Sequence, residues 1–175
     1  MPSHPLPAAG AERQPIRLDS AALACFAIAF PTLPLWAFVA VNPSAADFPE
    51  RLLWVWSVGA VLVVGIHLAD TIPDLGTDAE AGVQGLAHRL GMRRSLAVLW
   101  GAFVAAIALT LALWPVLRYH TAWYVTGLLA CLALMAAAGV AYGRPPRGVR
   151  TMSLLLEMGA LALAVGWVGG VLFGG

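Results

Sequence analysis

Residues 121–142 read TAWYVTGLLACLALMAAAGVAY, a continuous apolar run without a single charged side chain. A bilayer span needs about 20 consecutive apolar residues. In hydrocarbon the backbone must also satisfy its hydrogen bonds within the segment, which a helix does. This stretch therefore predicts a membrane-spanning α-helix, and with it an all-α fold for the chain.

Four further apolar stretches extend this interpretation, at 21–41, 52–69, 95–117 and 152–173. The chain has 175 residues, of which 61% are hydrophobic and 11% charged, whereas a soluble domain is about a quarter charged. We therefore predict a polytopic bundle of about five transmembrane helices over residues 20–175, preceded by a flexible cytoplasmic tail at 1–19. Pro31 should kink the first span; cleavage of that span as a leader is the less favoured alternative, because its apolar run is long.

The arginines set the expected orientation. Most of the arginines lie in the tail and in the connections at 70–94 and 143–150. The other connections hold only Arg51 and Arg118. Under the positive-inside rule this places the N-terminus in the cytoplasm and the C-terminus outside, in a cytoplasmic (inner) membrane. The net charge is +1 and no basic tract is present, so no nucleic-acid partner is expected.

The chemically distinctive segment is the connection after the second span, where residues 67–91 read HLADTIPDLGTDAEAGVQGLAHRLG. Asp70, Asp74 and Asp78 are spaced by four, which places them on nearly one face of a helix, although Pro73 interrupts a continuous one. Two carboxylates about 6 Å apart repel by roughly 3 kcal/mol at an effective dielectric constant of 20. Mg²⁺ would offset this repulsion, because it binds one or two carboxylates together with substrate phosphates. The pattern favours a metal–diphosphate site.

Two other interpretations of this segment remain open from the residues alone. It could be a solvated acidic loop, since Asp favours turns. A metal-ion transporter is a weaker alternative, because Glu157 is the only acidic residue well inside a predicted span. The EF-hand spacing of a calcium loop is not met.

The motif Asp70-x-x-x-Asp74-x-x-x-Asp78, followed by Ala81-Gly82-Val83 and Arg89-Leu90-Gly91, resembles the second aspartate-rich motif of the UbiA superfamily of intramembrane prenyltransferases. The resemblance implies the last five of that family's nine helices. It also implies Mg²⁺-dependent transfer of a prenyl group from a polyprenyl diphosphate to an acceptor. Asp70, Asp74 and Asp78 match the family's catalytic and metal-binding aspartates.

The sequence departs from the family in its other motif. The first aspartate motif, usually Asn-Asp-x-x-Asp-x-x-x-Asp, does not occur in these 175 residues. Gly85-Leu86-Ala87 stands where many relatives have Thr-Leu-Pro, and Gln84 stands where a basic residue is common. An alternative function is therefore a non-catalytic or degenerate membrane subunit, which pairs with a separate N-terminal half or with a second copy of itself.

Several residues outside the motif are candidates for supporting roles. His67, one turn before Asp70, and Arg89 are predicted to bind substrate, although a histidine at a span end is often only interfacial. Glu157 could line a polar cavity or reach the interface by snorkelling. Close helix contacts are expected at the glycines inside the spans: Gly65, Gly101, Gly139, Gly166, Gly169 and Gly170. Anchoring to anionic lipid is expected of Arg144, Arg147 and Arg150, with diphosphate steering as the less favoured alternative.

Overall fold

The computed structural model describes residues 53–144 and 147–173, and before them only 16–17, 25, 28–29, 32–33, 36 and 40. The predicted tail at 1–19, apart from 16–17, lies outside the described residues. So do Pro31, the continuous course of the predicted first span and its possible cleavage site. The account below concerns the described part of the chain.

Four long helices account for most of this part and confirm the predicted all-α membrane bundle. Each is long and apolar enough to cross a membrane. Their outer faces carry exposed Leu and Val side chains such as Val104, Leu129 and Leu161, as surfaces in contact with lipid do. The helices are α2 (Leu53–Thr71), α4 (Leu86–Leu117), α5 (Thr121–Tyr142) and α6 (Gly148–Phe173).

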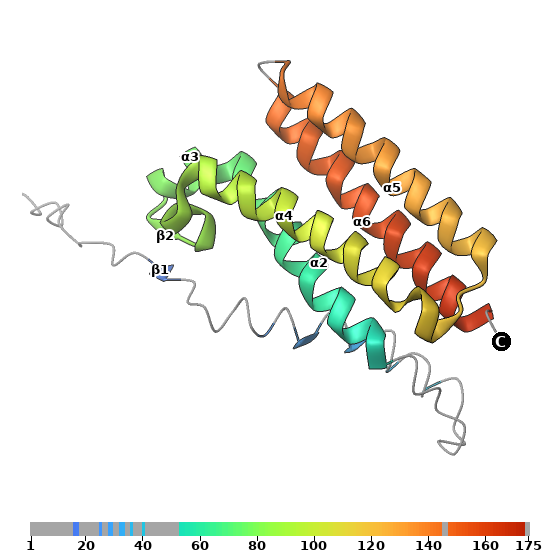
Figure 1. Ribbon diagram of the computed structural model, residues 1–175. Helices are drawn as coiled ribbons and strands as arrows, with labels where there is room; N and C mark the ends of the chain where they lie inside the picture. Colours follow the sequence, from blue (N-terminus) through green and yellow to red (C-terminus); the bar gives the residue numbers. More distant parts are fainter. Residues whose placement is uncertain are drawn as a thin grey trace, which may run out of the picture.

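The helices pack as two pairs, α2 with α4 and α5 with α6, and the pairs meet where α6 contacts α2 (Figure 1). Between α2 and α4 the buried side chains include Leu68, Leu99 and Phe103, which are fully excluded from solvent. Tyr124 of α5 and Trp167 of α6 are also buried, and each packs against Tyr119, with ring centroids 5.0 Å and 6.0 Å apart respectively. The second and fifth predicted spans are thereby brought side by side.

The α5–α6 pair is held unusually close by glycine. A Cβ atom added to Gly127 would lie 2.6 Å from the Cα atom of Gly166 and 2.6 Å from the carbonyl oxygen of Ala162. Real Cβ atoms do not come so close, so only glycine fits there, as at other close membrane helix contacts. The predicted role of Gly166 is confirmed, whereas Gly101 and Gly139 have nothing within 4 Å of such an atom.

The segment after α2 is more regular than a loop. A 3-10 turn, η3 (Ile72–Asp74), contains Pro73 near its start, and a short helix, α3 (Leu75–Glu80), follows. The backbone then forms a two-residue strand, β2 (Val83–Gln84), which pairs in parallel with β1 (Ile16–Arg17). The interruption expected at Pro73 is therefore a tight turn that lets the chain continue as a helix.

The third predicted span corresponds to the second part of α4. The helix begins at Leu86, but Gly91, with φ +71° and ψ 163°, is not helical and divides α4 there. The part after Gly91 begins at Met92, close to the expected residue 95. Arg93 and Arg94 are exposed in its first turn.

At the opposite end of the bundle, Tyr119 closes the short connection between α4 and α5. Its hydroxyl donates to the carbonyl oxygen of Thr110 (2.9 Å), and the Thr110 hydroxyl shares a hydrogen bond of 3.0 Å with the hydroxyl of Tyr124. The N–H of His120 donates to the carbonyl oxygen of Gly170 (2.9 Å). Burial raises the pKa of Tyr119 to about 12.

Candidate functional site

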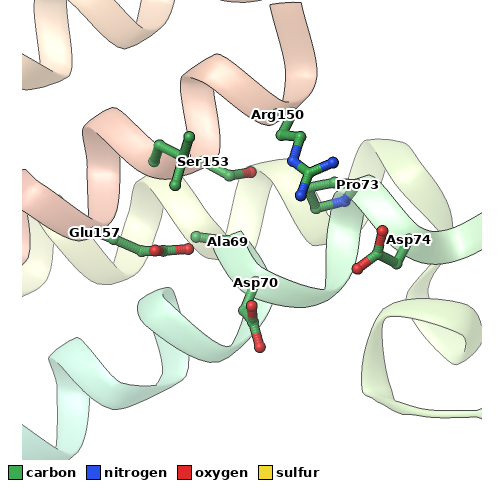
Figure 2. A pocket seen from close by; sticks show the side chains of 8 residues that line it. Ala69, Asp70, Pro73, Asp74, Arg150, Ser153 and Glu157 are labelled. Carbon is green, nitrogen blue, oxygen red and sulfur yellow. The ribbon is translucent and has the colours of Figure 1, made fainter. Parts of the chain in front are cut away.

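A polar pocket opens where the end of α2 meets the beginning of α6 (Figure 2). Its volume is about 120 Å³, which is room for several waters and hence for a partly hydrated cation or a phosphate group. Three acidic side chains and one arginine line it. The lining residues are Ala69, Asp70, Pro73, Asp74, Arg150, Ser153, Leu154 and Glu157.

The first wall of the pocket comes from α2 and η3. Asp70 lies in the last turn of α2, and Asp74 lies one helical turn further on, at the end of η3. Both side chains are exposed. The last turn of α2 contains no basic residue that could pair with Asp70.

The second wall is one face of α6. Arg150, Ser153 and Glu157 follow one another at intervals of three and four residues, so they lie along the side of the helix that faces α2 (Figure 2). Arg150 is exposed and its guanidinium extends toward Pro73, whereas Glu157 is partly buried deeper along the helix. Sequence reasoning had assigned Arg150 to lipid anchoring and had not singled out Ser153. The spacing 150, 153, 157 was the signal that could have identified this face.

The charge of the pocket is unbalanced. Three carboxylates face a single guanidinium, which leaves two net negative charges when all four groups are ionised. Glu157 and Asp70 are near enough to repel each other. Such a site disfavours a free anion and favours a cation, or an anion that arrives with a divalent cation.

The three motif aspartates do not meet at one point. Asp70 and Asp74 line the pocket, whereas Asp78 lies in α3, half-buried, and is not among its lining residues. Within the described ranges, no group of three or more His, Cys, Asp or Glu side chains is arranged to hold a metal ion by itself. The donor set fits Mg²⁺ only in its usual mode, with one or two carboxylates and the remaining positions taken by water and substrate phosphate.

The two predicted substrate-binding residues also lie outside the pocket. His67 is half-buried in α2, one turn before Asp70, and Arg89 is exposed in the first turn of α4. Neither contributes to the lining. Their predicted contacts with a substrate remain predictions.

His88 connects the acidic segment to α4. Its Nδ1 atom accepts from the N–H of Gly85 (3.4 Å), and its Nε2 atom lies 3.1 Å from the carbonyl oxygen of Leu75. A neutral ring with the proton on Nε2 makes both bonds at once. Because Leu75 follows Asp74 directly, this side chain fixes the backbone next to the pocket.

Comparison with known proteins gives a partial match to a membrane prenyltransferase. The chain is 37% identical, over 123 residues, to the 1,4-dihydroxy-2-naphthoate octaprenyltransferase of Mycobacterium tuberculosis (strain ATCC 25618 / H37Rv), a match that covers 65% of this chain. The match covers 41% of the relative, so it spans less than half of that protein's length. No family model matches the chain, and no solved structure matches it significantly.

The match supports the resemblance to the UbiA superfamily that the Asp70–Asp78 motif indicated. The chain is a helical membrane protein similar to a UbiA-type prenyltransferase.

Proposed function

We propose that this chain binds a polyprenyl diphosphate together with Mg²⁺ and takes part in transfer of the prenyl group to an acceptor. The observation that carries the proposal is the shared pocket of Asp70 and Asp74 at one end of an apolar bundle. The similarity to an octaprenyltransferase supports a long isoprenoid donor and suggests dihydroxynaphthoate as the first acceptor to test.

Asp70 and Asp74 would hold the cation, and Asp78 would join them only if α3 shifts toward the pocket. When bound, Mg²⁺ would neutralise charge that develops on the departing diphosphate. The carboxylates of Asp70 and Asp74 would hold the diphosphate through that ion at the end of the apolar bundle. The apolar helices would limit the access of water to the prenyl group.

The prenyl chain would lie along α6. Leu154 lines the pocket and is 56% exposed; Met158, Leu161 and Val165, one to three turns further on, are exposed to a similar extent. They form an apolar stripe that starts at the pocket and runs along the helix. An isoprenoid tail buries its surface there as favourably as in lipid, at about 25 cal/mol per Å² relative to water.

The test is binding of geranylgeranyl diphosphate to the purified chain in a neutral detergent, with Mg²⁺ and with EDTA, measured by calorimetry. We expect binding that depends on Mg²⁺ and is lost in Asp74→Ala. Glu80→Ala is the matched control, because Glu80 is an exposed acid of α3 outside the pocket. Equal binding by wild type and Asp74→Ala would refute the site.

The alternative function is a membrane subunit that completes its site with a separate partner. The observation that favours it is that, among the described residues, no group of three or more His, Cys, Asp or Glu side chains could hold a metal ion by itself. Under this proposal, a co-expressed chain that carries an Asn-Asp-x-x-Asp motif co-purifies with this one, and prenyl transfer to dihydroxynaphthoate requires both. Transfer by this chain alone would exclude the partner requirement.

A further inference from the structure

Ser153 is the least satisfied polar group in the pocket. Its side chain is 3% exposed, and its hydroxyl has no hydrogen-bond partner among the described residues. A buried hydroxyl without a partner costs about 1–3 kcal/mol, and natural structures rarely leave one unexplained. Because Ser153 also lines the pocket, a ligand in that pocket can supply the missing acceptor.

Arg150 stands beside this hydroxyl on the same face of α6 (Figure 2). A guanidinium offers donors only, in a planar fork that matches two phosphate oxygens. A serine hydroxyl can donate a third hydrogen bond to the same group. The two side chains thus offer donors from α6, whereas Asp70 and Asp74 of the other wall offer acceptor oxygens.

We propose that Arg150 and Ser153 form the phosphate-binding wall of the site and bind the non-bridging oxygens of the diphosphate, while Asp70 and Asp74 bind the accompanying cation. This inference rests on the proposed function, because it assigns a role in that same site. It gives Arg150 a role other than lipid anchoring and includes a residue that lies outside the aspartate-rich motif.

The net negative charge of the pocket adds a condition. A diphosphate without its cation would face three carboxylates with only Arg150 to attract it. Both walls therefore act together, and phosphate binding through α6 requires the divalent cation.

The experiment compares Arg150→Ala, Arg150→Lys and Ser153→Ala with wild type in calorimetric binding of three probes: geranylgeranyl diphosphate, inorganic diphosphate and the neutral alcohol geranylgeraniol, the diphosphates with Mg²⁺. We expect Arg150→Ala to weaken diphosphate binding by about 10- to 100-fold and Ser153→Ala by about 3- to 10-fold. Arg150→Lys should fall between wild type and Arg150→Ala, because it retains charge but not the fork. Binding of the alcohol should be unchanged.

The matched controls are Arg147→Ala and Thr151→Ala. Arg147 is an exposed arginine just before α6, and Thr151 is an exposed hydroxyl residue between the two proposed ligands; neither lines the pocket. Each control should change diphosphate affinity by less than about 2-fold, as expected for surface substitutions.

The thermal stability of Ser153→Ala distinguishes a role of the hydroxyl in binding from a role in the fold. Removal of an unsatisfied buried hydroxyl should raise the thermal stability of the ligand-free protein while it weakens diphosphate binding. A lower Tm with unchanged affinity would mean that the hydroxyl serves the fold, and would overturn its assigned role.

The lipid headgroup is the other source of phosphate for Arg150. Phosphatidylglycerol that co-purifies with each variant is measured by mass spectrometry. If Arg150→Ala loses this lipid and keeps its diphosphate affinity, Arg150 is a lipid anchor and the inference is wrong.

The outcomes also separate this inference from the proposed function. If Asp74→Ala abolishes binding but Arg150→Ala and Ser153→Ala do not weaken it, only the inference fails. If Arg150→Ala and Ser153→Ala weaken the binding of inorganic diphosphate with Mg²⁺, but the prenyl chain of geranylgeranyl diphosphate adds no affinity, only the proposed function fails. If wild type binds neither diphosphate, both fail.

Discussion

The Nε2 atom of His88 lies 3.1 Å from the carbonyl oxygen of Leu75, and this contact joins the start of α4 to the acidic segment thirteen residues earlier. The same ring accepts from the N–H of Gly85. One neutral imidazole thereby fixes both ends of the connection that carries Asp74 and Asp78.

His88→Ala should loosen this connection. It removes two hydrogen bonds, each worth about 0.5–1.5 kcal/mol. We expect faster hydrogen–deuterium exchange in residues 74–85 and a small decrease in Tm, while exchange in α5 is unchanged. Arg94→Ala, an exposed position on α4, is the control. Unchanged exchange in His88→Ala would show that the imidazole does not hold the segment.

Asp74 and Asp78 should differ in importance, because only Asp74 lines the pocket. We expect Asp74→Asn to weaken Mg²⁺-dependent binding of geranylgeranyl diphosphate by about 10- to 100-fold, as loss of a ligand or its support does. Asp78→Asn should weaken it by less than about 3-fold. Equal large losses would mean that α3 moves on binding and brings all three carboxylates together.

Gly127→Ala should separate α5 from α6. The added methyl group would overlap the backbone of Gly166, and overpacking of this kind costs about 1–3 kcal/mol. The measurement is thermal unfolding in detergent. Gly139→Ala on the same helix has nothing within 4 Å of the new atom, so it should be neutral or slightly stabilising, because alanine favours a helix by about 1 kcal/mol. A similar Tm for both variants would contradict the close contact.

Gly91→Ala should strain the bend in α4. With φ +71° and ψ 163°, Gly91 occupies a backbone region that is essentially restricted to glycine, where another residue costs about 1–3 kcal/mol. Gly101→Ala, further along α4 and also without close neighbours, is the control. We expect a decrease in Tm for the first variant only. A straightened α4 without loss of stability would show that the bend is not required.

Tyr119, at the far end of the bundle, should make the thermal stability of the protein depend on pH. Burial raises its pKa from 10 to about 12, so its neutral form is favoured in the folded protein. The resulting stabilisation is complete below pH 10 and is lost as the pH rises through about 12. Wild type should therefore lose Tm more steeply above pH 10 than Tyr119→Phe. If the Tm of wild type and of Tyr119→Phe fell equally with pH, Tyr119 would not be buried in the folded state.

Long apolar stretches predicted the bundle well, because hydrocarbon leaves a chain few alternatives to a helix. The stretches at 52–69, 121–142 and 152–173 correspond to α2, α5 and α6 within a few residues. The stretch at 95–117 corresponds to the part of α4 after Gly91, whereas the short helical piece before Gly91 was not predicted.

The site was only half predictable from the sequence. The spacing of Asp70 and Asp74 predicts that they share one face, and both residues line the same pocket. The same rule grouped Asp78 with them, but the 3-10 turn at Pro73 changes the rotation per residue, and Asp78 lies elsewhere. Arg150 and Ser153 reach the pocket through the packing of α6 on α2, a contact between segments about 80 residues apart that no local pattern encodes.

The close approach at Gly127 and Gly166 has a consequence for biogenesis. The connection between α5 and α6 is short and their backbones are in contact. The two helices can therefore leave the translocon and associate as a helical hairpin before either of them contacts α2. Arg150, Ser153 and Glu157 would then enter the bilayer already in register on a rigid unit. The last step of assembly, the docking of that hairpin against α2, would be the step that creates the pocket.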